Sequence, residues 1–510
     1  MKKYISILSI ILGTSAIQAQ DINDALRYSQ TEPLGTARFR ALSGAFGALG
    51  GDLSAVSINP AGSVIFKNNQ VAFTLSNYAS KNNNNYFGSR NSDSYNSFDL
   101  NQAGGVFVFE NNNHSDWKKF ALSLNYENQN NFDSSIYISG INPSNSIDKY
   151  FLAYANGNAY TNSVQLGNLQ NYYFDELYFN EQQAYLGYNA YIIDPIPLDT
   201  DPGNYDNPNI NQYTSAVLPG NFTHQYSAET TGYNGKLSFN AAANYQDKLM
   251  IGINLNSHFS DYTKYSSFFE SNDNNTTTDT YVKRIYFDND LHTYGNGFSF
   301  QIGAILKLDD QFRVGATYES PTWHKLTDEL IQRVAAVSGN NTGELPVDRV
   351  EPGIVMVFEP YTIQTPGKLT ASAAYIFDKQ GFLSVDFSSK DYSTMRLKPK
   401  SDYRDGNMLI EDLFTTSNEL RIGGEYKIEK WSLRGGFRYE SSPYKNEALM
   451  GDLKGYSGGI GYNFGGTKLD LAYATSKRDY GYQMFSTGLT DRANSTLKNN
   501  NVTVSLSFEL

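Results

Sequence analysis

Apolar and polar residues alternate along much of this chain. In the C-terminal stretch NNNVTVSLSFEL, every second residue from Val502 to Leu510 is apolar, and the residues between them are polar. KLMIGINLNSHF, which begins at Lys248, and WSLRGGFRYE, which begins at Trp431, repeat this pattern. A period of two predicts a β-strand with one apolar and one polar face. Long strands of this kind with aromatic ends favour a transmembrane β-barrel over a soluble sandwich, which alternates in the same way.

The connections between the predicted strands support the barrel. Short polar links alternate with much longer connections, as periplasmic turns alternate with extracellular loops in outer-membrane barrels. The short links lie near Asn111, Tyr245, Leu308, Asp378, Ile428 and Phe464. Pairing strands across them predicts an all-β fold, a transmembrane antiparallel barrel of about fourteen strands, and this even number places both chain ends on the periplasmic side. The predicted strand centres are Leu75, Val106, Leu124, Phe239, Ile253, Ile302, Val314, Ala373, Val385, Ile422, Leu433, Ile460, Leu471 and Val504, and the stretch 263–292 allows a second pairing.

The first residues, MKKYISILSIILGTSAIQAQ, have the order of an export signal. Lys2 and Lys3 precede an apolar run from Ile5 to Leu12, and small residues follow. This order is typical of a secretory signal peptide, which we expect to occupy residues 1–19. The apolar run is shorter than the roughly 18 residues of a membrane-spanning helix, which disfavours an uncleaved anchor.

A segment before the first strand is a candidate plug. A barrel of about fourteen strands is too wide for its own side chains to fill. We therefore expect residues 20–67, named the hatch here, to lie inside a barrel formed by residues 68–510. The hatch sequence ALSGAFGALGGDLSAVSINPAG is rich in small residues and too short for a core of its own. Its apolar surface, which argues against a disordered tail, consists of Leu42, Phe46, Leu49 and Val56.

The hatch ends in the sequence Asn59-Pro60-Ala61-Gly62. Pro60 cannot donate a backbone hydrogen bond and disfavours a helical conformation at Asn59, so the preceding helix ends there. Gly62 lets the chain turn into the first strand. Alone, this sequence indicates only a turn, but its position between a small-residue segment and a barrel makes these four residues candidates for gating.

One connection, roughly residues 129–232, is much longer than the others. Within it, YFDELYFNEQQAYLGYNAYII places apolar and aromatic residues mostly at helical spacings, and DKYFLAYANGNAY is a second candidate helix. Because long unstructured loops are uncommon, we expect a compact, partly helical extracellular cap. Such a cap either captures a hydrophobic ligand first or simply packs against itself.

Composition narrows the classes of function. The chain of 510 residues has no cysteine, which excludes disulfides, thiol catalysis and cysteine-ligated zinc. Its formal net charge is −12 and becomes −14 without Lys2 and Lys3, which argues against a nucleic-acid partner. The mean hydropathy of −0.48 matches a soluble protein, but barrel strands escape such averages because only alternate residues face lipid.

No catalytic, metal or cofactor site is expected. The five histidines have no metal-binding spacing, and they are His114, His224, His258, His292 and His324. GAFGALGG lacks the spacing of a dinucleotide-binding loop and follows no strand, and neither a nucleophile elbow nor a P-loop occurs. A Ser-His pair assembled across strands is disfavoured, because His258 is placed on the lumen face.

Arginines are the remaining polar candidates. Their guanidinium groups can hold a carboxylate through two parallel hydrogen bonds. The alternative, which we favour, is that the wall arginines pair with Glu319, Glu425, Glu440 and Asp470 on neighbouring strands or with the hatch. The candidates are Arg38 and Arg40 in the hatch and Arg313, Arg421, Arg434 and Arg438 in the wall.

With its hatch SGAFGALGGDLSAVSINPAG, its Asn59-Pro60-Ala61 signature and about fourteen strands, the mature chain resembles the FadL/TodX family of outer-membrane transporters for long-chain fatty acids and other hydrophobic compounds. The resemblance implies that the hatch plugs the lumen from the periplasmic side. It also implies that a hydrophobic substrate enters from outside, binds beside the hatch and leaves through a lateral gap in the wall.

The sequence departs from the family at that gap. The family gap comes from a kink in the third strand, but WKKFALSLNYENQ has no Gly or Pro. Gly104 and Gly105 lie in the second predicted strand instead, and glycines inside strands often mark bulges, so they are the candidate wall kink. The long excursion at 129–232 is a second departure.

These expectations define a function. We expect a hatch-gated protein of the Gram-negative outer membrane that takes up fatty acids or other hydrophobic compounds passively and releases them into the bilayer, without a cofactor. Its partners would be that substrate and outer-membrane lipid, and we expect a monomer. The alternative is a structural or adhesive surface barrel that binds a partner through its long loops.

Overall fold

The computed structural model describes residues 22–510 except 112, 114, 158–161, 275–277 and 379. The predicted signal peptide, residues 1–19, lies outside the described residues. Within them, no helix is both long enough and apolar enough to cross a membrane.

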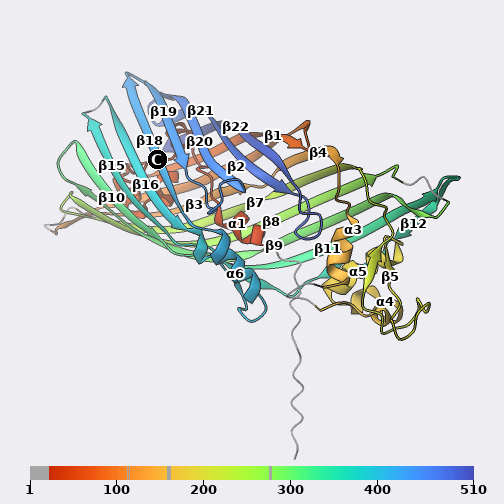
Figure 1. The fold of residues 1–510 in the computed structure, drawn as a ribbon. Helices are drawn as coiled ribbons and strands as arrows, with labels where there is room; N and C mark the ends of the chain where they lie inside the picture. The colour runs from red at the N-terminus through yellow and green to blue at the C-terminus, as the bar shows by residue number, and fades with distance from the viewer. Residues whose placement is uncertain (1–21, 112, 114, 158–161, 275–277, 379) are drawn as a thin grey trace, which may run out of the picture.

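The fold is a closed barrel of 14 antiparallel strands with short helices inside it (Figure 1). Strand β1 closes the barrel by pairing with β22. The wall consists of β1 (Gln70–Tyr86), β2 (Ser89–Glu110), β3 (Trp117–Asn131), β7 (Phe222–Tyr245), β8 (Leu249–Ser271), β9 (Tyr281–Lys307), β10 (Phe312–Glu319), β15 (Lys368–Phe377), β16 (Gly381–Asp391), β18 (Thr416–Ile428), β19 (Trp431–Glu440), β20 (Met450–Asn463), β21 (Thr467–Gln483) and β22 (Arg492–Glu509). Each predicted strand centre lies in a different one of these strands, so the predicted barrel is confirmed.

The two faces of the wall differ as the sequence pattern requires. On β22, Val504 and Leu506 are more than 40% exposed on the outer face, at 41% and 42%, whereas Thr503 and Ser505 are 0% and 1% exposed on the inner face. The apolar outer face suits lipid, and the polar inner face lines the lumen.

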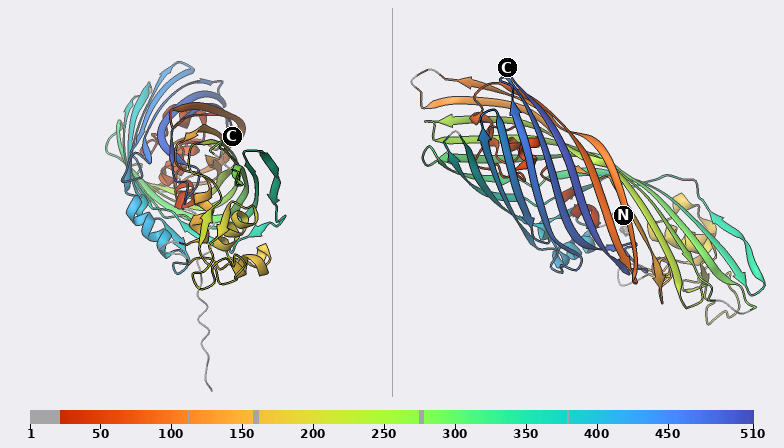
Figure 2. Two further views of the ribbon diagram at one scale, coloured as in Figure 1. Left: turned by 45° about the vertical axis from the view of Figure 1, so that its right-hand side comes forward. Right: turned by 90° about the horizontal axis from the view of Figure 1, so that it is seen from above.

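Several strands continue beyond the barrel wall (Figure 2). β7, β8 and β9 are 24, 23 and 27 residues long. Residues 281–298 of β9 pair with β11 (Trp323–Asn340), whereas residues 301–307 of β9 pair with β10. The remaining strands are β4 (Ser134–Asn142), β5 (Ile193–Pro195), β6 (Tyr213–Ser215), β12 (Gly343–Val350), β13 (Met356–Val357), β14 (Tyr361–Gln364) and β17 (Arg396–Lys398).

The long excursion is shorter than the sequence suggests. β3 extends to Asn131, β4 occupies Ser134–Asn142, and β7 begins at Phe222. The described residues of 143–221, named the outer cap here, remain outside the barrel strands. They contain α3 (Asp148–Ala155), α4 (Leu166–Asn171), η3 (Phe174–Glu176), α5 (Phe179–Asn189) and the β5–β6 pair.

The hatch lies inside the barrel (Figure 2, left). It contains α1 (Ile22–Ser29), α2 (Ala37–Ala41), η1 (Ser54–Ser57) and η2 (Pro60–Ile65). Outside it, η4 (Tyr392–Thr394) and α6 (Arg404–Leu413) belong to the connection between β16 and β18.

The described chain ends lie at opposite ends of the lumen. Leu510 donates its backbone N–H to Asn69, just before β1. Ile22 instead packs into a cluster that includes Ile410 of α6, and α1 lies close to α6 (Figure 1). The hatch therefore traverses the lumen before the chain enters β1. The periplasmic location of both chain ends stays a prediction.

Candidate functional site

Asn59 connects the hatch to the wall. Its side chain accepts a hydrogen bond from Ala61 N at 3.1 Å and so caps η2, with Pro60 in the first turn. Its Nδ2 donates to Gly47 O within the hatch at 2.7 Å and to Ala304 O on β9 at 3.0 Å. Asn59 is only 1% exposed, and both its amide oxygen and its amide nitrogen have hydrogen-bond partners. These partners lie in η2, in the hatch around Gly47 and on β9.

Wall glycines make room for this segment. A Cβ at Gly252 would lie 2.4 Å from the carbonyl carbon of Pro60, and one at Gly303 would lie 2.2 Å from Asn59 Oδ1. A Cβ at Gly315 would lie 2.4 Å from Gly47 O. Only glycine permits this approach of strand to hatch backbone. The signal in the sequence was a set of glycines at lumen-facing positions of strands.

Polar wall side chains bind the hatch backbone. Asp386 on β16 accepts hydrogen bonds from Phe46 N and Gly47 N, each at 3.0 Å. From the other side of the lumen, Asn240 donates to Pro60 O at 2.9 Å, Asn254 to Val56 O at 2.8 Å and Gln301 to Ser57 O at 2.9 Å. These lumen-facing residues were not singled out from the sequence, although their alternation with apolar neighbours places them on the inner face.

The predicted apolar surface of the hatch is buried. Leu42, Phe46, Leu49 and Val56 are 0%, 1%, 5% and 0% exposed. The first three pack with Ala374 and Phe382 of the wall in one cluster. In this closed arrangement the surface contacts the wall and the hatch itself.

Ion pairs join the hatch to the wall. Arg38 Nε lies 2.9 Å from Glu425 Oε2, and the same oxygen lies 2.7 Å from Arg434 Nε. Arg434 Nη1 also lies 2.6 Å from Asp470. The hatch therefore ends a chain of buried charges on β18, β19 and β21 that also passes over β20.

Each candidate arginine contacts a protein group. Arg438 pairs with Glu419 and Glu440 at 2.5 Å each, and Arg421 pairs with Glu419 at 2.7 Å. Arg313 donates to Leu49 O at 3.3 Å, and Arg40 donates to Tyr78 Oη at 3.2 Å. A role in holding a substrate carboxylate stays a prediction. Glu419 was missed, although it shares a strand face with Arg421 two residues later.

Within the hatch, Asp52 is a buried carboxylate. It accepts a hydrogen bond from Thr36 Oγ1 at 2.8 Å and one from Ser54 N at 2.9 Å. Burial raises the pKa of Asp52, and the neighbouring Arg38 opposes this rise.

Two small polar cavities lie between hatch and wall. One, of about 40 Å³, is lined among others by Glu32, Arg40 and Arg438. The second, of about 20 Å³, is lined among others by Lys368, Lys390 and Arg438. Both are the size of one or a few water molecules.

The wall is irregular beside the hatch, but not at the predicted glycines. Gly104 and Gly105 pair regularly with Asn125 and Leu124 of β3. The register between β1 and β2 shifts instead at Asn101, and the register between β3 and β7 shifts at Gln129. A bulge needs an extra unpaired residue, and Asn101 and Gln129 provide it here. Gly104 instead allows close approach, since a Cβ there would lie 2.4 Å from Asn125 Oδ1, and its role as the wall kink stays a prediction.

Backbone pairing between β2 and β3 ends beside these bulges. Its last pair is Gln102 with Glu127, and no further β2 pairing with β3 or β4 occurs among the described residues. Beyond that pair, β2 residues 89–101 and residues 128–142 are joined by side chains, as where Asn131 Nδ2 donates to Ser97 Oγ at 3.3 Å. We name this stretch the wall seam.

The hatch reaches the wall seam. Glu32 N donates to Gln129 O at 3.1 Å, and Asn130 Nδ2 donates to Gln30 O at 2.7 Å. The bulged segment of β3 is thus held by backbone contacts to the hatch in addition to the side-chain contacts of Asn128 and Asn131 with β2.

Metal ligands are not gathered in the described part of the chain, where no group of three or more His, Asp or Glu residues could hold a metal ion. His258 and His324, far apart in sequence, have ring centroids 5.4 Å apart. His114 lies outside the described residues.

Comparisons with known proteins agree with the fold. A family model described as "Outer membrane protein transport protein (OMPP1/FadL/TodX)" matches residues 210–506. A solved FadL homologue from Pseudomonas aeruginosa is 14% identical, with a TM-score of 0.52, and the match covers 94% of this chain and 99% of that chain.

Two further solved structures are toluene transporters. TbuX of Ralstonia pickettii is 13% identical with a TM-score of 0.48, and the match covers 95% of this chain and 100% of that chain. TodX of Pseudomonas putida is 13% identical with a TM-score of 0.48, and the match covers 94% and 100%. No curated protein matches this chain. At such identities, the Pseudomonas aeruginosa structure supports the fold alone.

Proposed function

This chain belongs to the OMPP1/FadL/TodX family of outer-membrane transport proteins, and we propose that it carries hydrophobic small molecules, such as fatty acids or aromatic hydrocarbons, passively from outside the cell into the outer membrane. The family consists of transport proteins rather than enzymes. The FadL homologue and the toluene transporters named above support this class of substrate. The adhesive alternative has no comparable support.

The driving force would be the substrate's own hydrophobicity. Moving an apolar chain out of water gains about 0.8 kcal/mol per methylene. Between α1 and the start of β1, the hatch fills the lumen and forms buried ion pairs with the wall. An apolar substrate would have to displace these ion pairs to pass straight through. A sideways exit avoids that cost.

The wall seam is the exit that the contacts support best. There, a few side-chain hydrogen bonds replace the continuous backbone ladder. Because each contributes only modestly to stability, separating the strands at the seam costs less than breaking a full ladder. Phe98 and Leu100 on the outer face of β2 are 68% and 43% exposed, which suits contact with lipid. Glu32 of the hatch contacts Gln129 of the wall, and Asn130 of the wall contacts Gln30 of the hatch. These contacts would couple movement of the hatch to opening of the wall seam.

The remaining expectations become part of the same proposal. Residues 20–67 act as the hatch, Asn59 and Pro60 hold it closed, and the protein works as a monomer in contact with outer-membrane lipid. We place the C-terminus on the periplasmic side, because short turns lie at that end of the barrel.

An uptake assay tests the proposal. Cells that lack their own transporter would receive this protein, and its surface location would be verified before radiolabelled long-chain fatty acid or toluene is added. The expected result is saturable uptake that depends on the protein. Surface-exposed protein with no stimulated uptake of either compound would refute it.

A further inference from the structure

The outer cap meets a loop that is not its neighbour around the barrel. Residues 484–491, named the closing loop here, connect β21 to β22. Around the barrel, β22 is separated from β8 by β1, β2, β3 and β7. A contact between the closing loop and the extensions of β8 and β9 therefore crosses the mouth of the lumen.

An aromatic cluster makes that contact. Phe485 of the closing loop has its ring centroid 5.2 Å from that of Tyr150 in α3. The same ring lies 5.1 Å from Phe268 on β8 and 6.1 Å from Phe287 on β9. Cap, closing loop and strand extensions thus share one buried core.

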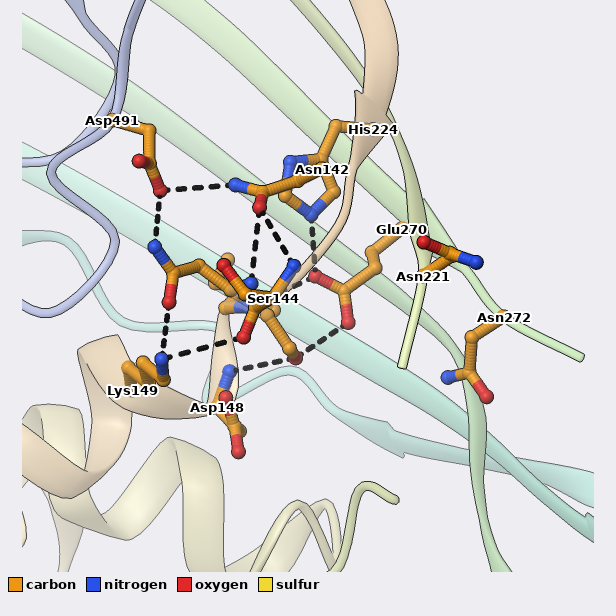
Figure 3. A network of polar contacts seen from close by, with 12 residues as sticks. Asn142, Ser144, Asp148, Lys149, Asn221, His224, Glu270, Asn272 and Asp491 are labelled. Atoms are coloured by element: carbon orange, nitrogen blue, oxygen red, sulfur yellow. Dashed lines mark hydrogen bonds and ion pairs between the residues drawn. The ribbon is translucent and has the colours of Figure 1, made fainter. Parts of the chain in front are cut away.

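A chain of polar contacts joins the same elements, and Figure 3 shows its two outer parts, the contact of Asn142 with Asp491 and that of His224 with Glu270. Asn142 Nδ2 lies 2.9 Å from Asp491 Oδ2 and 3.2 Å from Tyr86 Oη. Tyr86 Oη lies 3.0 Å from His224 Nδ1, and His224 Nε2 lies 3.0 Å from Glu270 Oε2.

An amide nitrogen can only donate, so Tyr86 Oη accepts from Asn142. The His224 ring bridges Tyr86 Oη and Glu270 Oε2 through its two nitrogens, and the tautomer sets which partner donates at each. His224 and Glu270 are 0% and 1% exposed, so each contact counts.

Glu270 also holds the start of α3. Its two carboxylate oxygens accept hydrogen bonds from Ser146 Oγ at 2.5 Å and from Ile147 N at 2.9 Å. At the other end of the chain, Asp491 accepts a hydrogen bond from Asn145 Nδ2 at 2.7 Å. The first turn of the cap is therefore fastened on two sides.

We propose that the outer cap is a gate over the mouth of the barrel, and that a latch running from Asp491 through Tyr86 to Glu270 holds it closed until a substrate enters. This rests on the proposed transport function. When the gate opens, water can replace the hydrogen-bond donors at Glu270, so the exposed carboxylate keeps partners. The polar part of the closure is thus breakable.

A cysteine cross-link tests the gate, and the natural chain has no cysteine to interfere. Asn145→Cys with Asp491→Cys, joined by a short bifunctional thiosulfonate reagent, would fasten the cap to the closing loop. The control pair is Asn168→Cys with Glu181→Cys, whose native side chains lie 2.7 Å apart inside the cap. We expect uptake to fall to the level of cells without the protein in the first pair, to recover on reduction, and to persist in the control. Uptake that continues through the cross-linked first pair would overturn the gate.

A second measurement does not depend on transport. Leu489→Cys places a reporter at a position of the closing loop that is 1% exposed. Adding Glu270→Gln should raise its labelling by a membrane-impermeant maleimide roughly tenfold, because a hydrogen bond to a charged group is lost. Unchanged labelling would overturn the latch. If labelling rises but the wild type transports neither fatty acid nor toluene, the latch stands and the proposed function falls.

Discussion

Gly303 lies so close to Asn59 that a Cβ at this glycine would fall 2.2 Å from Asn59 Oδ1. The side chain of Asn59 therefore fills the space that a larger residue at position 303 would need. The position of the hatch depends on this wall residue being glycine.

Gly303→Ala should loosen the hatch without breaking the barrel. The added methyl group forces Asn59 away from Ala304 O, at an overpacking cost of about 1–3 kcal/mol. We expect higher ion conductance in planar bilayers and faster protease cleavage of the hatch. The matched control is Gly435→Ala, where a Cβ meets no described atom within 4 Å. Equal conductance of the two variants would contradict the role of Gly303.

Glu425→Gln should weaken the same closure from the other side of the lumen. Arg434 keeps Asp470 at 2.6 Å, but Arg38 loses the carboxylate that fastens the hatch. The loss of a hydrogen bond to a charged group costs about 1.5–3 kcal/mol. We expect higher ion conductance in planar bilayers. Adding Arg38→Met to Glu425→Gln should raise the conductance little further, because the ion pair is already broken.

The control for Glu425 is Glu509→Gln. Glu509 pairs with Lys468 at 2.6 Å, but the two side chains are 31% and 38% exposed, and Glu509 also accepts a hydrogen bond from Asn68 at 3.1 Å rather than from a buried hatch arginine. Such a pair contributes about 0–1 kcal/mol. A leak as large in this control as in Glu425→Gln would show that the hatch pair has no special role.

Local patterns explain why the barrel could be predicted from sequence. The period of two and the short turns are properties of neighbouring residues, and they located the strand centres, including Val504 in the unbroken C-terminal alternation. The turn at Asn59-Pro60 was local as well. Its hydrogen bond to Ala304 was not, because it joins positions more than two hundred residues apart.

The wall seam could not be predicted for a related reason. The stretch around Gln129 contains no Gly or Pro, and its bulge depends on a backbone partner, Glu32, that comes from the hatch. The limits of the cap likewise depend on how far β4 and β7 pair beyond the membrane. The pairing of Arg434 with Glu425 on the neighbouring strand matches the favoured alternative, in which opposite charges pair across strands.

Acidity should affect the hatch through Asp52. Burial raises the pKa of Asp52 above the value of about 3.9 in an unfolded chain. The folded hatch then favours the protonated form, so the contribution of Asp52 to stability is largest below that value and falls as pH rises through the folded pKa. Asp52→Asn keeps an acceptor for Thr36 and should remove this dependence. Protease cleavage of the hatch at acidic and neutral pH, compared between the two proteins, measures it, and identical pH profiles would contradict it.

Locking the wall seam should block the exit while leaving the outer gate free. Asp99 and Asn128 face each other across the seam through a side-chain hydrogen bond. Asp99→Cys with Asn128→Cys, once oxidised, would replace that contact by a covalent bond, and uptake should stop until a reductant is added. Phe107→Cys with Leu122→Cys is the control, because these residues are opposite partners where the β2–β3 ladder is already complete. Uptake that survives oxidation of the seam pair would place the exit elsewhere, whereas loss in both pairs would show that β2 and β3 must separate along their whole length.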